Sequence, residues 1–221
     1  MTAPRIRALF LDFGNVCASF RFDRFTDHFA RKTGVPGRIV EKALFDGAED
    51  GISYSPLFSA FECGTIGPTQ FFHQLTAELE CSHRIDYQTF AQLWTSIFDE
   101  ENDALDHLLS RVQIPKFLLS NTNLAAYTHY IAECAIVRTH MPLPTQRILS
   151  YREGVLKPDR KIYDVAIQRA GIDFDEALFV DDRAENLRAW ETLGGYSIHY
   201  HARGHHIKQL EIGLQRFGVL S

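Results

Sequence analysis

Acidic residues follow two apolar runs that lie far apart in the chain. Residues 8–11 end at Asp12, and residues 177–180 end at the adjacent pair Asp181 and Asp182. Aspartate is depleted in strands, and neighbouring carboxylates repel each other. One such aspartate can be the N-cap of a following helix. Two such runs together favour a site for a hard cation, which oxygen ligands hold.

A lysine stands where a cation is unexpected. Lys157 precedes Pro158, a residue type that is favoured at the first position of a helix, and the apolar spacing of residues 162–170 predicts that helix. A lysine at a helix N-terminus opposes the helix dipole. That small cost is explained if Lys157 faces an anion or the carboxylates, although a solvated surface lysine remains the alternative.

The elements that must position these residues follow from hydrophobic patterning. Strands are expected near residues 7–12, 116–119, 147–151, 177–180 and 196–200, with helices between the later ones. This alternation predicts an α/β fold, with a parallel sheet and helices on both faces. Ligands bind such sheets beyond the carboxyl ends of the strands. We therefore expect Asp12, Ser120, Asn121, Asp181 and Asp182 to converge.

Residues 18–97 have a different pattern. Apolar side chains recur at helical spacing in four stretches, near residues 22–29, 39–44, 71–79 and 90–98. These stripes predict a small bundle of helices. The many aromatic residues of this segment are interpreted as packing of the bundle, with Tyr54, Phe58 and Phe61 as candidates for a substrate entrance.

Composition excludes several classes of partner. The 221 residues carry a formal net charge of −5, with no basic stripe for nucleic acid. No apolar run approaches the roughly 20 residues of a membrane span, and the N-terminus does not resemble a secretory signal. The four cysteines are scattered without a C-x-x-C pair, so we expect neither a zinc site nor a disulfide framework, and a cytoplasmic location. The oligomeric state stays open.

Four ordered segments resemble the motifs of the haloacid dehalogenase-like (HAD) hydrolase superfamily. They are residues 12–16 (Asp-Phe-Gly-Asn-Val), residues 120–123 (Ser-Asn-Thr-Asn), Lys157-Pro158, and Asp181-Asp182 with Asn186. The first and third motifs look most like the bacterial phosphatase branch that includes sugar-1-phosphate phosphatases. The resemblance implies a Rossmann-like core, residues 1–17 and 98–221, and an inserted α-helical cap, residues 18–97.

The resemblance also implies a mechanism and a cofactor, Mg²⁺. Asp12 would attack the phosphorus of a small phosphorylated metabolite, possibly a sugar phosphate, and form an aspartyl phosphate, while Lys157 stabilises the charge. The implied metal ligands are Asp12, the main-chain carbonyl of Gly14, Asp182 and, partly through water, Asp181, with Asn186 supporting them. The implied substrate-binding residues are Ser120, Asn121 and Asn15.

One position departs from the family pattern. Most phosphatases of the superfamily carry a second aspartate two residues after the nucleophile, as general acid and base, and here that position is Gly14. Loss of such help typically costs about 10²–10⁴-fold in rate. Three explanations stay open: a substrate with a good leaving group such as an anomeric sugar phosphate, an acid supplied by water or by Glu49, Asp50 or Glu62, or inefficient hydrolysis.

Two rival functions share the fold. A 2-haloacid dehalogenase would use the same nucleophile, but dehalogenases of the family need no metal, so the Asp181-Asp182 pair argues against it. A non-catalytic binding protein is supported only by Gly14. The charge cluster of Asp12, Lys157 and Asp182 argues against it, because a chain without catalytic demands has no physical reason to keep it.

Overall fold

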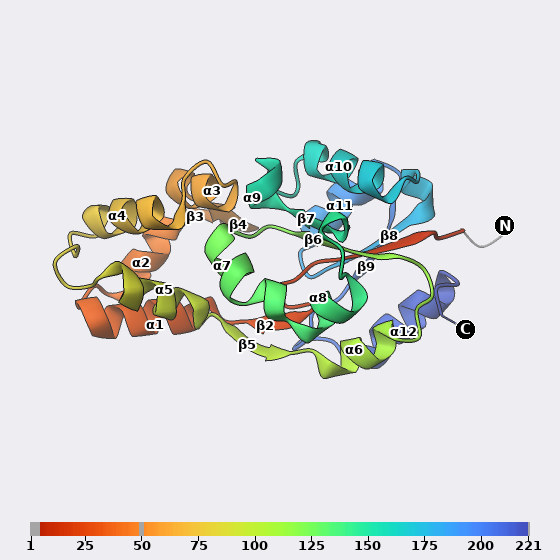
Figure 1. Ribbon diagram of the computed structural model, residues 1–221, viewed down its shortest axis with the longest axis horizontal. Coiled ribbons are helices and arrows are strands. Elements are labelled where there is room, and N and C mark those ends of the chain that lie inside the picture. The colour runs from red at the N-terminus through yellow and green to blue at the C-terminus, as the bar shows by residue number, and fades with distance from the viewer. Residues whose placement is uncertain (1–4, 49–50, 221) are drawn as a thin grey trace.

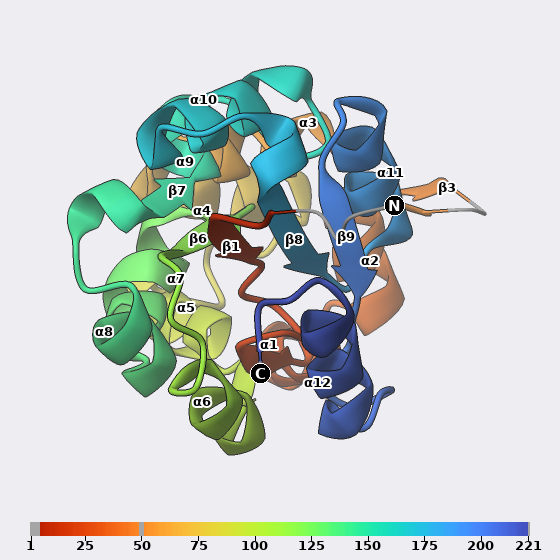
Figure 2. The same ribbon diagram turned by 90° about the vertical axis from the view of Figure 1, so that its right-hand side faces the viewer.

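A parallel sheet of five strands forms the centre of the molecule (Figures 1 and 2). The computed structural model describes residues 5–48 and 51–220. The strand order is β7-β6-β1-β8-β9, and every neighbouring pair is parallel. The strands are β1 (Ala8–Leu11), β6 (Lys116–Ser120), β7 (Arg147–Leu149), β8 (Ala177–Asp181) and β9 (Tyr196–His199). The predicted α/β fold is confirmed.

Alternation along the strands gives the sheet two buried faces. Leu9 and Leu11 of β1 belong to one apolar cluster, and Ala8 and Phe10 belong to another. The Phe10 face is covered by α10 (Arg160–Ala170) and α11 (Ala184–Thr192), as Figure 2 shows. The opposite face is covered by α6 (Asp103–Leu109), α7 (Leu124–His129), α8 (Ala135–His140) and α12 (Ile207–Arg216). Because the sheet is covered on both sides, its central strands β1, β6 and β8 are almost continuously apolar.

Five helices gather at one end of the molecule, on the left of Figure 1. They are α1 (Phe22–Thr33), α2 (Gly37–Leu44), α3 (Pro56–Glu62), α4 (Pro68–Glu78) and α5 (Tyr87–Thr95). Trp94 of α5 is 1% exposed and packs against the rings of Phe25 and Phe71. The inserted helical segment is therefore present and has an aromatic core.

The bundle is joined to the sheet region by a short antiparallel ribbon. Strand β2 (Ala18–Phe20) pairs with β5 (Phe98–Glu101), so the chain enters and leaves the bundle side by side. A second ribbon, β3 (Phe45–Ala48) with β4 (Gly51–Tyr54), lies between α2 and α3. Neither ribbon was predicted. The division into cap and core at residues 17/18 and 97/98 stays a prediction.

Two local predictions near the site were wrong. The strand expected to reach residue 151 ends at Leu149, because the chain turns into the short helix α9 (Ser150–Glu153). The helix expected to begin at Pro158 begins at Arg160, where the side chain of Asp159 accepts a hydrogen bond from the Lys161 N–H at 2.9 Å. Lys157 therefore lies in the preceding turn rather than at the helix N-terminus.

Within the described residues, no helix has both the length and the apolar character needed to cross a bilayer.

Candidate active site

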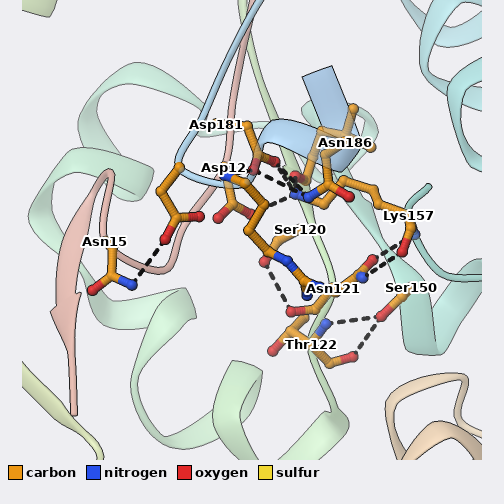
Figure 3. A network of polar contacts seen from close by, with 12 residues as sticks. Asp12, Asn15, Ser120, Asn121, Thr122, Ser150, Lys157, Asp181 and Asn186 are labelled. Atoms are coloured by element: carbon orange, nitrogen blue, oxygen red, sulfur yellow. Dashed lines mark hydrogen bonds and ion pairs between the residues drawn. The ribbon is translucent and has the colours of Figure 1, made fainter. Parts of the chain in front are cut away.

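The carboxyl ends of the three central strands bring the predicted residues together. Asp12 follows β1, Ser120 ends β6, and Asp181 ends β8. Since β1 lies between β6 and β8, these ends lie side by side at the middle of the sheet edge. Figure 3 shows Asp12, Ser120, Lys157, Asp181 and Asn186 around one point. The convergence expected from the sequence is present.

Lys157 is the cation at the centre of this group. Its Nζ lies 2.7 Å from Asp12 Oδ1, 2.7 Å from Asp181 Oδ2 and 2.9 Å from the Leu119 carbonyl. Burial alone would lower the pKa of Lys157, which is 4% exposed, but the charges of Asp12 and Asp181 raise it. The ammonium is therefore firmly charged, and the alternative of a solvated surface lysine is wrong.

Asn121 fixes the position of that lysine. Its side-chain Nδ2 donates to the Lys157 carbonyl at 2.9 Å, and its Oδ1 accepts from the Lys157 N–H at 2.7 Å. This pair of bonds joins the loop after β6 to the turn before α10. The Asn121 side chain is thus used to hold Lys157, and only its main chain stays available for the predicted phosphate contact.

Three carboxylates form a group that suits a metal ion. One oxygen each from Asp12, Asp181 and Asp182 lies within 4.8 Å of the others. Burial raises the pKa of Asp12 to about 7, although Lys157 lowers it, and the charges of Asp181 and Asp182 raise it further. Burial also raises the pKa of Asp182. Lys157 alone does not balance three carboxylates, so a divalent cation fits the charge of the site.

Neighbouring amides orient this acidic group. Asn186 Nδ2 lies 3.1 Å from both oxygens of Asp181, and the Arg183 N–H donates to Asp181 Oδ1 at 2.8 Å. The buried Asn186 Oδ1 has no hydrogen-bond partner among the described residues. A buried acceptor without a donor is costly, and a metal-bound water is a suitable donor. This orphaned oxygen is a second observation that fits a cation at the group.

Asn15 occupies an unusual backbone conformation. Its φ of 56° lies in the left-handed region, which asparagine tolerates better than most residues. Its Nδ2 donates to Asp182 Oδ2 at 2.9 Å, and its Oδ1 accepts from the Phe20 N–H at 3.1 Å. Both ends of the amide therefore have protein partners: the bond from Phe20 fixes the amide, and the amide positions Asp182. The predicted contact of Asn15 with substrate stays a prediction.

The carboxylates open onto a cavity of about 720 Å³ between the bundle and the sheet. Asp12, Gly14, Ser120, Lys157 and Asp182 line its inner end. Its other walls are mainly aromatic, from Phe20, Phe22, Phe45, Tyr54, Phe58, Trp94 and Phe98. The cavity can hold a phosphate ester with the phosphoryl group at the carboxylates and the organic part against the rings.

Of the three aromatic residues expected at the substrate entrance, two line the cavity and one is packed inside the bundle. Tyr54 and Phe58 line the cavity. Phe61 is 2% exposed and stacks on Phe71 with ring centroids 4.1 Å apart, so it belongs to the packing of the bundle.

Sequence reasoning missed the residues that support the loop after β6. Ser150 at the start of α9 accepts from the Thr122 N–H at 2.8 Å and joins this loop to α3 through the Glu62 carbonyl at 2.7 Å. Ser150 stands in no motif, so no sequence signal pointed to it. Glu62 was named only as one of three candidates for an acid. The other two, Glu49 and Asp50, lie outside the described residues.

Known proteins are similar to this chain over most of its length. A D-ribitol-5-phosphate phosphatase from Bacteroides thetaiotaomicron is 28% identical over 196 residues, covering 86% of this chain and 89% of the relative. A sesquiterpene phosphatase, astK, from Aspergillus oryzae is 25% identical and covers 66% of this chain and 72% of the relative.

A solved structure shares the whole fold. It is a HAD family enzyme from Bacteroides thetaiotaomicron in complex with magnesium and inorganic phosphate, with a TM-score of 0.75 and 25% identity. The match covers 93% of this chain and 98% of that one. The model of the haloacid dehalogenase-like hydrolase family matches residues 59–194, more than half of the sequence. The resemblance seen in the four motifs is thereby confirmed, and the chain belongs to the haloacid dehalogenase-like hydrolase family.

Proposed function

We propose that this protein is a magnesium-dependent phosphatase of small phosphorylated metabolites that works through an aspartyl phosphate. The observation that carries the proposal is the buried ion pair of Lys157 with Asp12 at the inner end of a substrate-sized cavity. Related chains in the comparison are phosphatases, and a solved relative binds magnesium and phosphate. A nucleophile, a fixed cation and a cavity above them are the parts that phosphoryl transfer requires.

Asp12 is the proposed nucleophile. Its carboxylate would attack the phosphorus atom of the ester, and the alcohol would leave from the opposite side. Lys157 holds Oδ1 of that carboxylate in place at 2.7 Å and would stabilise charge on the phosphoryl oxygens. Water would then hydrolyse the aspartyl phosphate and release inorganic phosphate.

The acidic group is the proposed magnesium site. Asp12, the Gly14 carbonyl and Asp182 would bind the ion directly, with Asp181 beside them partly through water, and Asn186 would orient Asp181. When bound, the ion neutralises phosphate charge so that an anionic nucleophile can approach. Asn15 would hold Asp182 in place through the 2.9 Å bond already described.

The substrate is proposed to be bound at its two ends. Ser120 and the main-chain N–H of Asn121 would bind phosphate oxygens, and Asn15 lines the same inner end of the cavity. The aromatic walls would contact the organic part, which we propose to be a sugar or another small metabolite that presents an apolar face. The cap, residues 18–97, supplies most of those walls, so it would determine specificity. A cytoplasmic location remains a prediction.

Phosphate release from a panel of phosphorylated metabolites tests this function. The wild type and the isosteric variant Asp12→Asn are compared with Mg²⁺ and with EDTA. Magnesium-dependent release that is lost in Asp12→Asn is expected. Asp175→Asn is the matched control, because Asp175 is an exposed aspartate just before β8, at the opposite end of that strand from the site.

Two outcomes would contradict the proposal and identify a rival. Halide release from 2-haloacids that persists in EDTA, without phosphate release, identifies a dehalogenase. Folded protein that binds Mg²⁺ and hydrolyses no ester identifies a non-catalytic binding protein.

A further inference from the structure

Glu62 is a carboxylate that the mechanism above leaves without a role. It is the last residue of α3 and is 5% exposed, yet it lines the same cavity as Asp12 and Gly14. No ion pair found within the described residues includes Glu62. A buried carboxylate without a cation is costly, so its presence beside the site requires an explanation.

One hydrogen bond attaches Glu62 to the loop after β6, and a second attaches it to the start of α9. Its Oε1 accepts from Asn123 Nδ2 at 2.6 Å, and its main-chain carbonyl lies 2.7 Å from Ser150 Oγ. Asn123 is also the N-cap of α7, where its Oδ1 accepts from the Ala126 N–H at 2.9 Å. The carboxyl group is therefore held in a fixed position relative to the inner end of the cavity.

A purely structural role does not need an acid at this position. The bond from Asn123 requires only an acceptor oxygen, which glutamine supplies without a charge to bury. Burial raises the pKa of Glu62 to about 7, against the lowering effect of the Asn123 bond. The group can thus donate a proton and take one back near neutral pH, as a general acid and base must.

Other titratable groups on the cavity wall suit this role less well. Burial raises the pKa of Tyr54, and the charges of Glu62 and Asp12 raise it further, so this phenol holds its proton too tightly. Asp23 and Glu41 also line the cavity, but Arg21 lowers the pKa of Asp23, and Glu41 is exposed. Cys63, next to Glu62 in the sequence, is not among the residues that line this cavity.

We propose that Glu62 is the general acid and base of the reaction, supplied by the cap in place of the side chain that Gly14 lacks. This inference rests on the proposed phosphatase function. In the first step an oxygen of Asp12 bonds to phosphorus, the ester P–O bond breaks, and the Glu62 proton moves to the departing oxygen, which leaves as an alcohol. In the second step the Glu62 carboxylate takes a proton from water, whose oxygen bonds to phosphorus. The P–O bond to Asp12 then breaks and inorganic phosphate leaves.

The leaving group separates this role from a structural one. An alkyl phosphate needs its departing oxygen protonated, whereas 4-nitrophenyl phosphate does not. With an alkyl phosphate that the wild type hydrolyses, Glu62→Gln is expected to lose about 10²–10⁴-fold in kcat. With 4-nitrophenyl phosphate the variant should release about one equivalent of nitrophenolate per site in a rapid burst, followed by slow turnover, because only the second step still lacks its base.

Control variants keep the result interpretable. Glu78→Gln removes an exposed carboxylate from α4, outside the residues that line the cavity, and should not change either substrate's kinetics. Glu62→Asp keeps a carboxyl group and should retain part of the alkyl phosphatase activity, which a packing role does not predict. Glu62→Gln preserves the acceptor for Asn123, and its thermal unfolding verifies that it is folded.

The outcomes distinguish a failure of the role of Glu62 from a failure of the proposed phosphatase function. The role of Glu62 would be overturned, and the phosphatase function kept, by either of two results. One is that Glu62→Gln hydrolyses the alkyl phosphate at the wild-type rate. The other is that the variant loses equal activity on both substrates and shows no burst. A wild type that hydrolyses no ester would overturn the proposed function itself, and the role of Glu62 with it.

Discussion

Lys157 contributes more to the free energy of unfolding than a surface lysine would. It is buried with Asp12 and Asp181, and its third bond is to the Leu119 carbonyl. Removing one partner of a buried ion pair typically costs about 3–5 kcal/mol, because the remaining charges are left unpaired. The same residue is the proposed source of transition-state charge stabilisation, so structure and activity should depend on it together.

Lys157→Met should therefore lower the free energy of unfolding by about 3–5 kcal/mol in metal-free buffer, measured by urea denaturation. The control is Lys161→Met, which removes an exposed lysine from the first turn of α10 and should cost less than about 1 kcal/mol. A loss for Lys157→Met as small as that of the control would mean that the buried pair contributes little.

Glu62 predicts an unusual dependence of stability on pH. In the unfolded chain its pKa returns to the usual value near 4.5, whereas burial holds it at about 7 in the folded state. Between these values the unfolded state ionises first, so the free energy of unfolding falls as the pH rises. At about 1.4 kcal/mol for each pKa unit, the loss is roughly 3 kcal/mol and is complete above pH 7.

Glu62→Gln should remove that loss. Its free energy of unfolding should equal that of the wild type near pH 4.5 and exceed it by roughly 3 kcal/mol at pH 8, measured by denaturation at both values. The variant would thus gain stability where it loses activity, as is common for groups retained for function. If the difference in unfolding free energy between the wild type and Glu62→Gln does not change with pH, Glu62 is not a buried carboxyl group with a raised pKa.

At the scale of elements, the sheet was predictable and the ribbons were not. Strands β1, β6 and β8 are apolar runs ended by polar residues, and such runs are visible in one sequence. Strand β2 has only three residues and pairs with β5, which lies nearly eighty residues further along. A pattern of three residues has no period, and the pairing depends on tertiary structure.

Helix α3 illustrates a signal that was present and not used. Ser55 accepts a hydrogen bond from the Phe58 N–H, and Pro56 occupies the first helical turn, so the sequence Ser-Pro marks a helix start. The helix has only seven residues, too few for a clear apolar stripe. Its recognition would have placed Glu62 at the end of a helix, although not beside the sheet.

The site was predictable as far as the strand ends determine it. Asp12, Ser120 and Asp181 converge because parallel strands present their carboxyl ends at one edge. Ser150 and Glu62 reach the same place through contacts between a loop, α9 and α3, which no spacing in the sequence encodes. Residues contributed by the sheet were thus visible beforehand, and those contributed by packing between segments were not.

Gly64 determines how closely α3 approaches α9. Its φ is +70°, and a Cβ there would lie 2.2 Å from the Tyr151 carbonyl oxygen. Gly154 has nearly the same φ, +71°, with nothing within 4 Å of its Cβ position. The two glycines share the backbone penalty for an L-residue and differ only in the close contact.

Gly154→Ala should therefore cost about 1–2 kcal/mol of unfolding free energy. Gly64→Ala should cost clearly more, because α3 must also move away from α9. Urea denaturation of both variants gives the difference directly. Gly64→Ala should also reduce phosphatase activity, since the displaced helix carries Glu62. Equal stability losses at the two positions would contradict the close approach of α3 to α9.

At the scale of the whole molecule, the cavity lies between two parts that the ribbon of β2 and β5 joins. Asp99 of that ribbon pairs with Arg24 of α1 at 2.8 Å and with Arg203, which follows β9. The Glu62–Asn123 bond and the Ser150 contact cross the same boundary further in. Because polar contacts can break and re-form at modest cost, we predict that the bundle moves against the sheet, with the hinge near residues 17–20 and 95–99.

Hydrogen exchange with Mg²⁺, with and without vanadate as a phosphate analogue, tests this motion. Vanadate at the inner end of the cavity should favour the arrangement in which Glu62 contacts Asn123, so α3 and the residues after β6 should exchange more slowly. Helix α10 packs on the Phe10 face of the sheet and carries none of the proposed ligand-binding residues, so its exchange should be unchanged and it serves as an internal control. Protection that rises equally in α10 and in α3 would indicate general stabilisation by the ligand rather than movement of the bundle. If α3 does not respond while vanadate demonstrably binds, the bundle and the sheet form one rigid body, and Glu62 is in place before the substrate arrives.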